Sequence, residues 1–111
     1  MNITIQGVEN MTGDMELEQA AEILKALAHP VRLCIVRGLW RNGACNVAHM
    51  QQCLETPQST ISQHLARLRT AGIIEGERNG LEVFYHLKSP EAERLLQGLF
   101  EKKKRKYVDA E

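Results

Sequence analysis

Residues 46–71 read NVAHMQQCLETPQSTISQHLARLRTA, and this stretch carries the clearest structural signal in the chain. Apolar residues at helical spacing predict a short helix over residues 46–54, with Asn46 as a good N-cap, and a second helix over residues 58–71. Between them lie Glu55, Thr56 and Pro57, which make a tight turn. Two short helices with such a connection form a helix-turn-helix.

Two further helices are predicted upstream of this motif. The first, over about residues 15–28, has leucines and alanines at the spacing of one helical face: Leu17, Ala20, Ala21, Leu24, Leu27 and Ala28. His29-Pro30 ends it, because the residue before a proline avoids the helical conformation. The second runs from about Pro30 to Trp40, with Leu33, Val36, Leu39 and Trp40 as its buried stripe, and Asn42-Gly43 closes it.

After Gly72 the spacing of the apolar residues changes from that of a helix to every second residue. Leu81, Val83, Tyr85 and Leu87 alternate with other side chains, which is typical of a strand, and Asn79-Gly80 predicts a hairpin to a partner strand over residues 73–77. Ser89-Pro90-Glu91 then begins a last helix. The sequence therefore predicts a mostly helical fold with a β-hairpin wing, in the order α-α-α-α-β-β-α: a winged helix-turn-helix.

The chain has 111 residues, which indicates one domain. We expect an N-terminal arm over residues 1–14, a DNA-binding and dimerisation domain over 15–107 and a C-terminal tail over 108–111. The 14 basic and 14 acidic residues cancel, but residues 25–74 hold six basic residues and one acidic residue. A polyanion interacts with the local charge of the surface it approaches and not with the net charge of the protein. The zero net charge therefore does not exclude nucleic acid as a partner.

The sequence predicts a cytoplasmic protein with no membrane partner. The longest apolar run has four residues, Leu33 to Val36, and the first basic residue is Lys25, so neither a membrane span nor a secretory signal is expected. The three cysteines are an odd number with no C-x-x-C spacing, which argues against a disulfide framework.

The predicted helix over residues 58–71 has an unusual outer face. With Ile61, Leu65 and Leu68 inward, the outward positions carry amides, hydroxyls and a guanidinium, and no acidic residue occurs between Thr56 and Ile74. An ordinary solvated face would mix Glu and Lys, whereas Gln, Arg and Ser suit base edges and phosphates. The predicted contacts to double-stranded DNA are Gln58, Ser59, Thr60, Ser62, Gln63, His64 and Arg67, with Arg78 and Asn79 at the wing tip. The basic run over residues 102–106 is either a further phosphate contact or a solvated helix end.

The first and last helices both have apolar faces, and one small domain cannot cover both. A symmetric homodimer would bury them, with an interface made of Leu17, Leu24, Leu95, Leu96, Leu99 and Phe100. It would also set two recognition helices roughly 34 Å apart, one turn of DNA, which predicts an inverted-repeat operator.

Three blocks of the sequence resemble the ArsR/SmtB family of bacterial winged-helix repressors: AHPVRL at residues 28–33, QSTISQHL at 58–65 and RNGLEVFY at 78–85. The chain is most similar to the PagR-like branch, which shares the second block. The resemblance implies a dimeric transcriptional repressor that binds an operator at its own or a neighbouring promoter and releases it on receiving a signal.

The resemblance also indicates where a signal would bind. The two cysteines of the family's metal motif, C-V-C-[DE]-L, fall on Asn46 and Ala48, and residues 89–107 hold no histidine for the alternative site on the last helix. We therefore expect no metal and no cofactor. A thiol- or metal-responsive repressor remains the alternative. Cys34 and Cys45 form a possible redox pair, since a helix start lowers the pKa of a neighbouring thiol, and Cys53 is expected to be buried.

Two other classes of protein fit the sequence less well than a repressor. A protein-interaction module on a winged-helix scaffold would need no DNA, but the acid-free helix argues against it. No Ser-His-Asp spacing or phosphate-binding loop occurs, and the chain is short for a deep cleft, so an enzyme is not expected.

Overall fold

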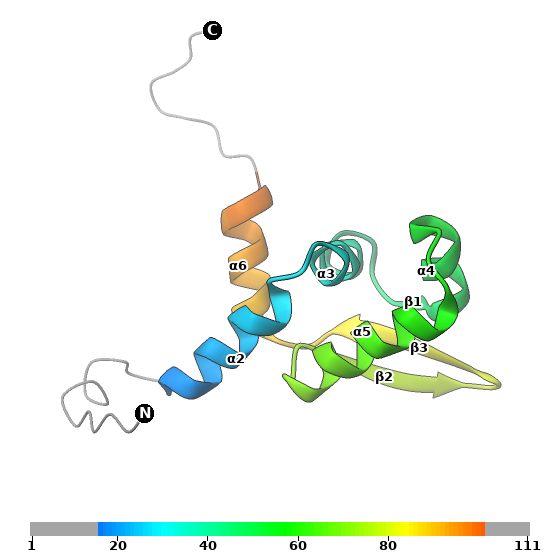
Figure 1. Ribbon diagram of the computed structural model, residues 1–111, viewed down its shortest axis with the longest axis horizontal. Coiled ribbons are helices and arrows are strands. Elements are labelled where there is room, and N and C mark those ends of the chain that lie inside the picture. Colours follow the sequence, from blue (N-terminus) through cyan, green and yellow to red (C-terminus); the bar gives the residue numbers. More distant parts are fainter. Residues whose placement is uncertain (1–15, 102–111) are drawn as a thin grey trace, which may run out of the picture.

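The computed structural model describes residues 16–101, in which five helices pack together with a small sheet at one edge of the domain (Figure 1). The elements follow the order α2 (Leu17–Leu27), α3 (Pro30–Asn42), β1 (Cys45–Asn46), α4 (Val47–Leu54), α5 (Gln58–Thr70), β2 (Ile74–Asn79), β3 (Glu82–Leu87) and α6 (Pro90–Phe100). The winged helix-turn-helix predicted from the sequence is confirmed. The predicted arm, the tail and the basic run lie outside the described residues.

Three of the helices, α3, α4 and α6, begin at a residue whose side chain caps them. The His29 ring accepts a hydrogen bond from the Val31 amide at 3.1 Å, and Pro30 starts α3. The Ser89 hydroxyl accepts from the Ala92 amide at 3.0 Å, and Pro90 starts α6. Each cap satisfies an amide that has no partner inside its helix, and proline at the first position has no amide to satisfy.

The turn of the helix-turn-helix is as short as predicted. Glu55 ends α4 in the left-handed conformation, with φ of 51°. The carbonyl of Pro57 then accepts hydrogen bonds from the amides of Thr60 and Ile61, which starts α5. The two helices are therefore joined by three residues.

The sheet contains one strand that the sequence pattern did not reveal. The order is β1-β3-β2, all antiparallel, and β1 pairs Cys45 with Tyr85 and Asn46 with Phe84. Two residues are too few to show an alternating pattern, so this segment was predicted as loop and helix start. Asn46 also caps α4 and donates from its side chain to the Glu82 carboxylate at 2.9 Å, which ties the start of α4 to the wing close to its turn. Strand β2 reaches Asn79, two residues beyond the prediction.

The core is built around α5. Ile61, Leu65 and Leu68, predicted to face inward, are buried among residues from all the other helices and the wing. Leu96 is also fully buried, so its predicted place in a dimer interface was wrong: it fills the core of its own chain. No helix within residues 16–101 is both long and apolar enough to cross a membrane.

Candidate nucleic-acid interface

The first two turns of α5 present uncharged polar side chains to solvent. Gln58, Ser59, Ser62 and Gln63 are exposed, and Thr60 is half-buried. None of the four exposed side chains has a hydrogen bond to another side chain within the described residues, and the first turn carries no acidic residue. These side chains are free to bind groups outside the protein.

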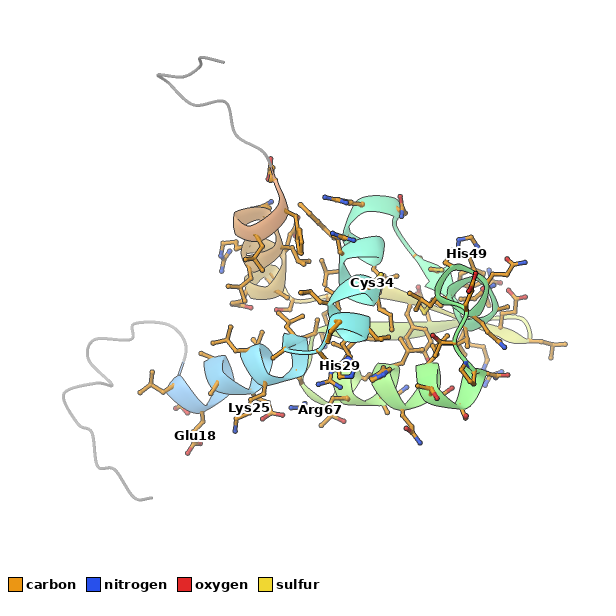
Figure 2. The ribbon with its side chains drawn as sticks, turned by 45° about the horizontal axis from the view of Figure 1, so that its top comes forward. Glu18, Lys25, His29, Cys34, His49 and Arg67 are labelled. Carbon is orange, nitrogen blue, oxygen red and sulfur yellow. The ribbon has the colours of Figure 1, made fainter. Side chains whose placement is uncertain are left out.

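The second half of α5 is tied to the preceding helices. Arg67 forms an ion pair with Glu22 of α2, with 2.8 Å between Nη1 and Oε2. Figure 2 shows Arg67 on α5 beneath the junction of α2 and α3, close to His29. Arg67 was predicted to face DNA, but in the protein alone it is half-buried and its charge is already paired.

His64 sits in a cluster with His29 and Arg32. The two imidazole rings have centroids 4.5 Å apart, and Arg32 Nη1 lies 3.4 Å from His64 Nδ1. Arg32 is held by its Nε, which donates to the Ala26 carbonyl at 2.6 Å. Burial lowers the pKa of His64, and the neighbouring His29 and Arg32 lower it further. The cluster therefore favours a neutral His64 that links α5 to α3.

The wing tip lies beyond the first turn of α5. Arg78 and Asn79 are exposed at the end of β2, and Gly80 adopts a φ of 70° in the turn that follows. Both views show the hairpin extending past the N-terminal end of α5 (Figures 1 and 2). Leu81, at 97% exposure, is the most exposed of the large apolar side chains described.

The predicted dimer residues divide into exposed and covered side chains. Leu17 and Leu24 on α2 are 51% and 54% exposed, and Leu95 and Leu99 on α6 are 37% and 66% exposed. Both helices lie on the side of the domain away from the wing tip (Figure 1). Phe100 is half-buried beneath Arg37, whose guanidinium carbon lies 4.8 Å from the ring centroid.

Two predictions about the cysteines were wrong. Cys53 was expected to be buried but is exposed, because Met50 and Leu54 define the inner face of α4 and Cys53 falls beside it. The pKa of Cys45 was expected to be lowered but is raised, first by burial and then by the nearby Cys53. Cys45 lies in β1 rather than at the first turn of α4, and the lowering of its pKa by the hydrogen bond to the Asn46 backbone does not offset the effect of burial. Cys34 is exposed. Within residues 16–101 no group of three or more His, Cys, Asp or Glu side chains is placed to hold a metal ion.

Comparisons with known proteins agree with this geometry. A helix-turn-helix domain family matches residues 27–77. The transcriptional repressor PagR of Bacillus anthracis is 43% identical over 83 residues, which cover 75% of this chain and 83% of PagR. The transcriptional repressor SmtB of Mycobacterium tuberculosis is 46% identical over 71 residues, covering 64% of this chain and 52% of SmtB. The crystal structure of PagR superposes with a TM-score of 0.70 over 75% of this chain and 94% of PagR.

Proposed function

We propose that this chain, which belongs to the ArsR/SmtB family of helix-turn-helix transcriptional repressors, binds an inverted-repeat operator as a homodimer. It is a DNA-binding repressor and not an enzyme. The operator lies at a promoter, its own or a neighbouring one.

The first half of α5 reads the DNA sequence in this proposal. Side chains at the start of a recognition helix reach deepest into the major groove. Gln63 can form two hydrogen bonds with adenine, while Ser59 and Ser62 adapt to a base edge or a phosphate. The exposed Gln58 and the half-buried Thr60 flank them. Arg78 and Asn79 on the wing contact the backbone or the minor groove beside this site.

The observation that carries the dimer is the set of four exposed leucines on α2 and α6. Exposed leucine side chains are costly in water, and a twofold axis would bury each of them against the same face of a second copy. Since both helices lie away from the wing, such an axis leaves both recognition helices free (Figure 1).

Light scattering and DNA binding with one substitution in α6 test this proposal. Leu99→Glu removes the most exposed of the four leucines and adds a charge, so we expect a monomer that has lost most of its affinity for an inverted repeat. Leu81→Glu is the matched control for the mass measurement, because it changes a leucine on the wing that is even more exposed than Leu99 and should leave a dimer. Circular dichroism confirms that both variants are folded.

The DNA measurement uses fluorescence anisotropy with labelled upstream DNA at several salt concentrations. Affinity should fall steeply as salt rises, because phosphate contacts release counterions. A dimer that survives Leu99→Glu would contradict the interface. Equal binding to an inverted repeat and to its single half-site would contradict the operator symmetry.

A further inference from the structure

All three cysteines of the chain line one cavity. It has a volume of about 270 Å³ and lies between α3, β1 and α4. Cys34 comes from α3, Cys45 from β1 and Cys53 from α4, while Ile35, Leu39 and Met50 form an apolar floor that belongs to the core. Figure 2 labels Cys34 on α3 and His49 on α4, the two helices that flank the cavity.

One of these thiols has a base beside it. The Sγ of Cys53 lies 3.5 Å from Nε2 of His49, one helical turn earlier on α4 and also on the cavity wall. In the tautomer with Nε2 unprotonated, Cys53 donates a hydrogen bond to this nitrogen. A thiol paired with an imidazole in this way is an activated nucleophile, because the ring can take the proton as the sulfur attacks.

The other two thiols lack such a partner. Cys45 is half-buried with a raised pKa, and its Sγ donates to the Asn46 carbonyl at 3.5 Å. Cys34 is exposed, and no hydrogen bond from its thiol occurs among residues 16–101. Reactivity at the cavity should therefore concentrate on Cys53, which is both accessible and paired with a base.

The cavity wall indicates the class of ligand. No Asp, Glu, Lys or Arg lines it, which favours an uncharged molecule. A cation would need a converging set of ligands, which the described residues do not hold. Hydrogen peroxide is small and polar and would gain nothing from an apolar floor. The volume lies just below the roughly 300 Å³ at which ordinary ligand pockets begin, so the molecule is small.

We propose that this cavity is a covalent binding site for a small, uncharged, apolar electrophile of the α,β-unsaturated carbonyl class, with Cys53 as the nucleophile and His49 as its base. The apolar part of the molecule rests on Ile35, Leu39 and Met50, which brings the carbon–carbon double bond to the Cys53 sulfur. This assignment does not depend on how the protein binds DNA.

The reaction adds the thiol across the double bond. His49 Nε2 takes the proton from Cys53, and the sulfur forms a bond to the β-carbon. The electron pair of the double bond moves to give an enolate, and the proton on His49 passes to the α-carbon. No oxidant is consumed and no group leaves.

The test is a rate measurement on the reduced full-length protein. Ethyl vinyl ketone serves as the apolar probe and acrylamide as a polar probe of similar size, and peptide mass spectrometry follows the label at each cysteine. We expect ethyl vinyl ketone to label Cys53 at least about tenfold faster than Cys34, since a positioned base accelerates proton transfer by more than this. The preference should be smaller with acrylamide and should vanish in denaturant.

Two variants, with one control, distinguish the effect of the His49 base on the rate from the effect of the cavity. His49→Gln should lower the rate at Cys53 about tenfold with both probes. His86→Gln, which changes a half-buried histidine on β3, should leave the rate unchanged. Gly38→Leu fills the cavity from α3, where a Cβ would meet no atom within 4 Å, and should slow ethyl vinyl ketone only. Melting temperatures show that each variant folds.

Three results would overturn the proposal. They are equal rates at Cys34 and Cys53 in the native protein, no effect of His49→Gln on Cys53, and equal slowing of both probes by Gly38→Leu. Because no DNA is present in the assay, a failure here is distinct from a failure of the proposed operator binding.

Discussion

The two halves of α5 differ in what their side chains do. In the first half, Gln58, Ser59, Ser62 and Gln63 are exposed and free, whereas in the second half Arg67 and His64 are bound to α2 and α3. A helix that reads DNA must present some side chains and must also be held in place. Here the two tasks are separated along the helix, so that substitutions in each half should have different effects.

The largest expected effect comes from Gln63→Ala in the free half. Losing a two-bond contact to a base should cost about 1–3 kcal/mol of discrimination, or about 5- to 150-fold in affinity for the preferred operator. The melting temperature should not change, because Gln63 is exposed. Anisotropy titrations with the operator and with a single-base variant of it provide the measurement.

Thr70→Ala is the matched control for this experiment. Thr70 is exposed and polar but lies on the last turn of the same helix, so its loss should leave both affinity and sequence preference unchanged. If Thr70→Ala relaxes the preference for the operator sequence as much as Gln63→Ala does, the first half of α5 is not the part that contacts the bases.

A covalent adduct at Cys53 should displace the exposed side chains in the first half of α5, because α4 connects the two. Helix α4 leads through three residues into the start of α5, so a ligand wedged between α3 and α4 would shift the reading side chains. We expect about a tenfold loss of operator affinity after treatment with ethyl vinyl ketone, within the usual range of coupling between two sites. Cys53→Ser should resist the treatment, and a treated wild type that binds as well as before would show that α4 does not transmit the change.

Arg67→Met should have a small effect on stability and none on sequence preference. The ion pair with Glu22 is about one-third to one-half exposed, so its loss should lower the free energy of unfolding by no more than about 1 kcal/mol. Urea unfolding and operator titrations measure the two quantities. A relaxed preference would mean that Arg67 leaves Glu22 to contact a base, as the sequence alone predicted.

Glu22→Gln sharpens this prediction because it frees Arg67 without removing it. If the pair only anchors α5, Glu22→Gln should resemble Arg67→Met in stability and leave DNA binding unchanged. Tighter binding of Glu22→Gln to any DNA would instead show that Glu22 competes with phosphate for the guanidinium.

The fold was predictable because its signals are local. Prolines, capping residues and the Asn79-Gly80 turn set most element ends within two residues, and the spacing of Ile61, Leu65 and Leu68 identified the inner face of α5. Strand β1 was not predictable, because its two residues are defined by pairing with β3, which is far away in sequence.

The site was predictable to the extent that it depends on one helix. Helical spacing placed Gln63 and Ser59 on the outer face, but it could not show that Glu22 reaches Arg67 or that Arg32 and His29 meet His64, because these contacts join different helices. The cavity was missed for the same reason. Its three cysteines come from three elements, and only the folded chain brings them to one wall.

The smallest expected effect concerns His64 and the pH. Its pKa is lowered in the folded protein, so below about 6.5, the ordinary value, the unfolded chain binds a proton more readily than the folded one. The stability that a neutral His64 provides is therefore complete above this pH and is lost as the pH falls toward the folded pKa. A charged His64 would face His29 and Arg32, and the resulting repulsion would loosen α5 from α3. We expect the melting temperature to fall more between pH 7.5 and 5.5 for the wild type than for His64→Gln. An equal fall in both proteins would mean that the cluster positions α5 by packing alone. The charge state of His64 would then have no effect on how the second half of α5 is held.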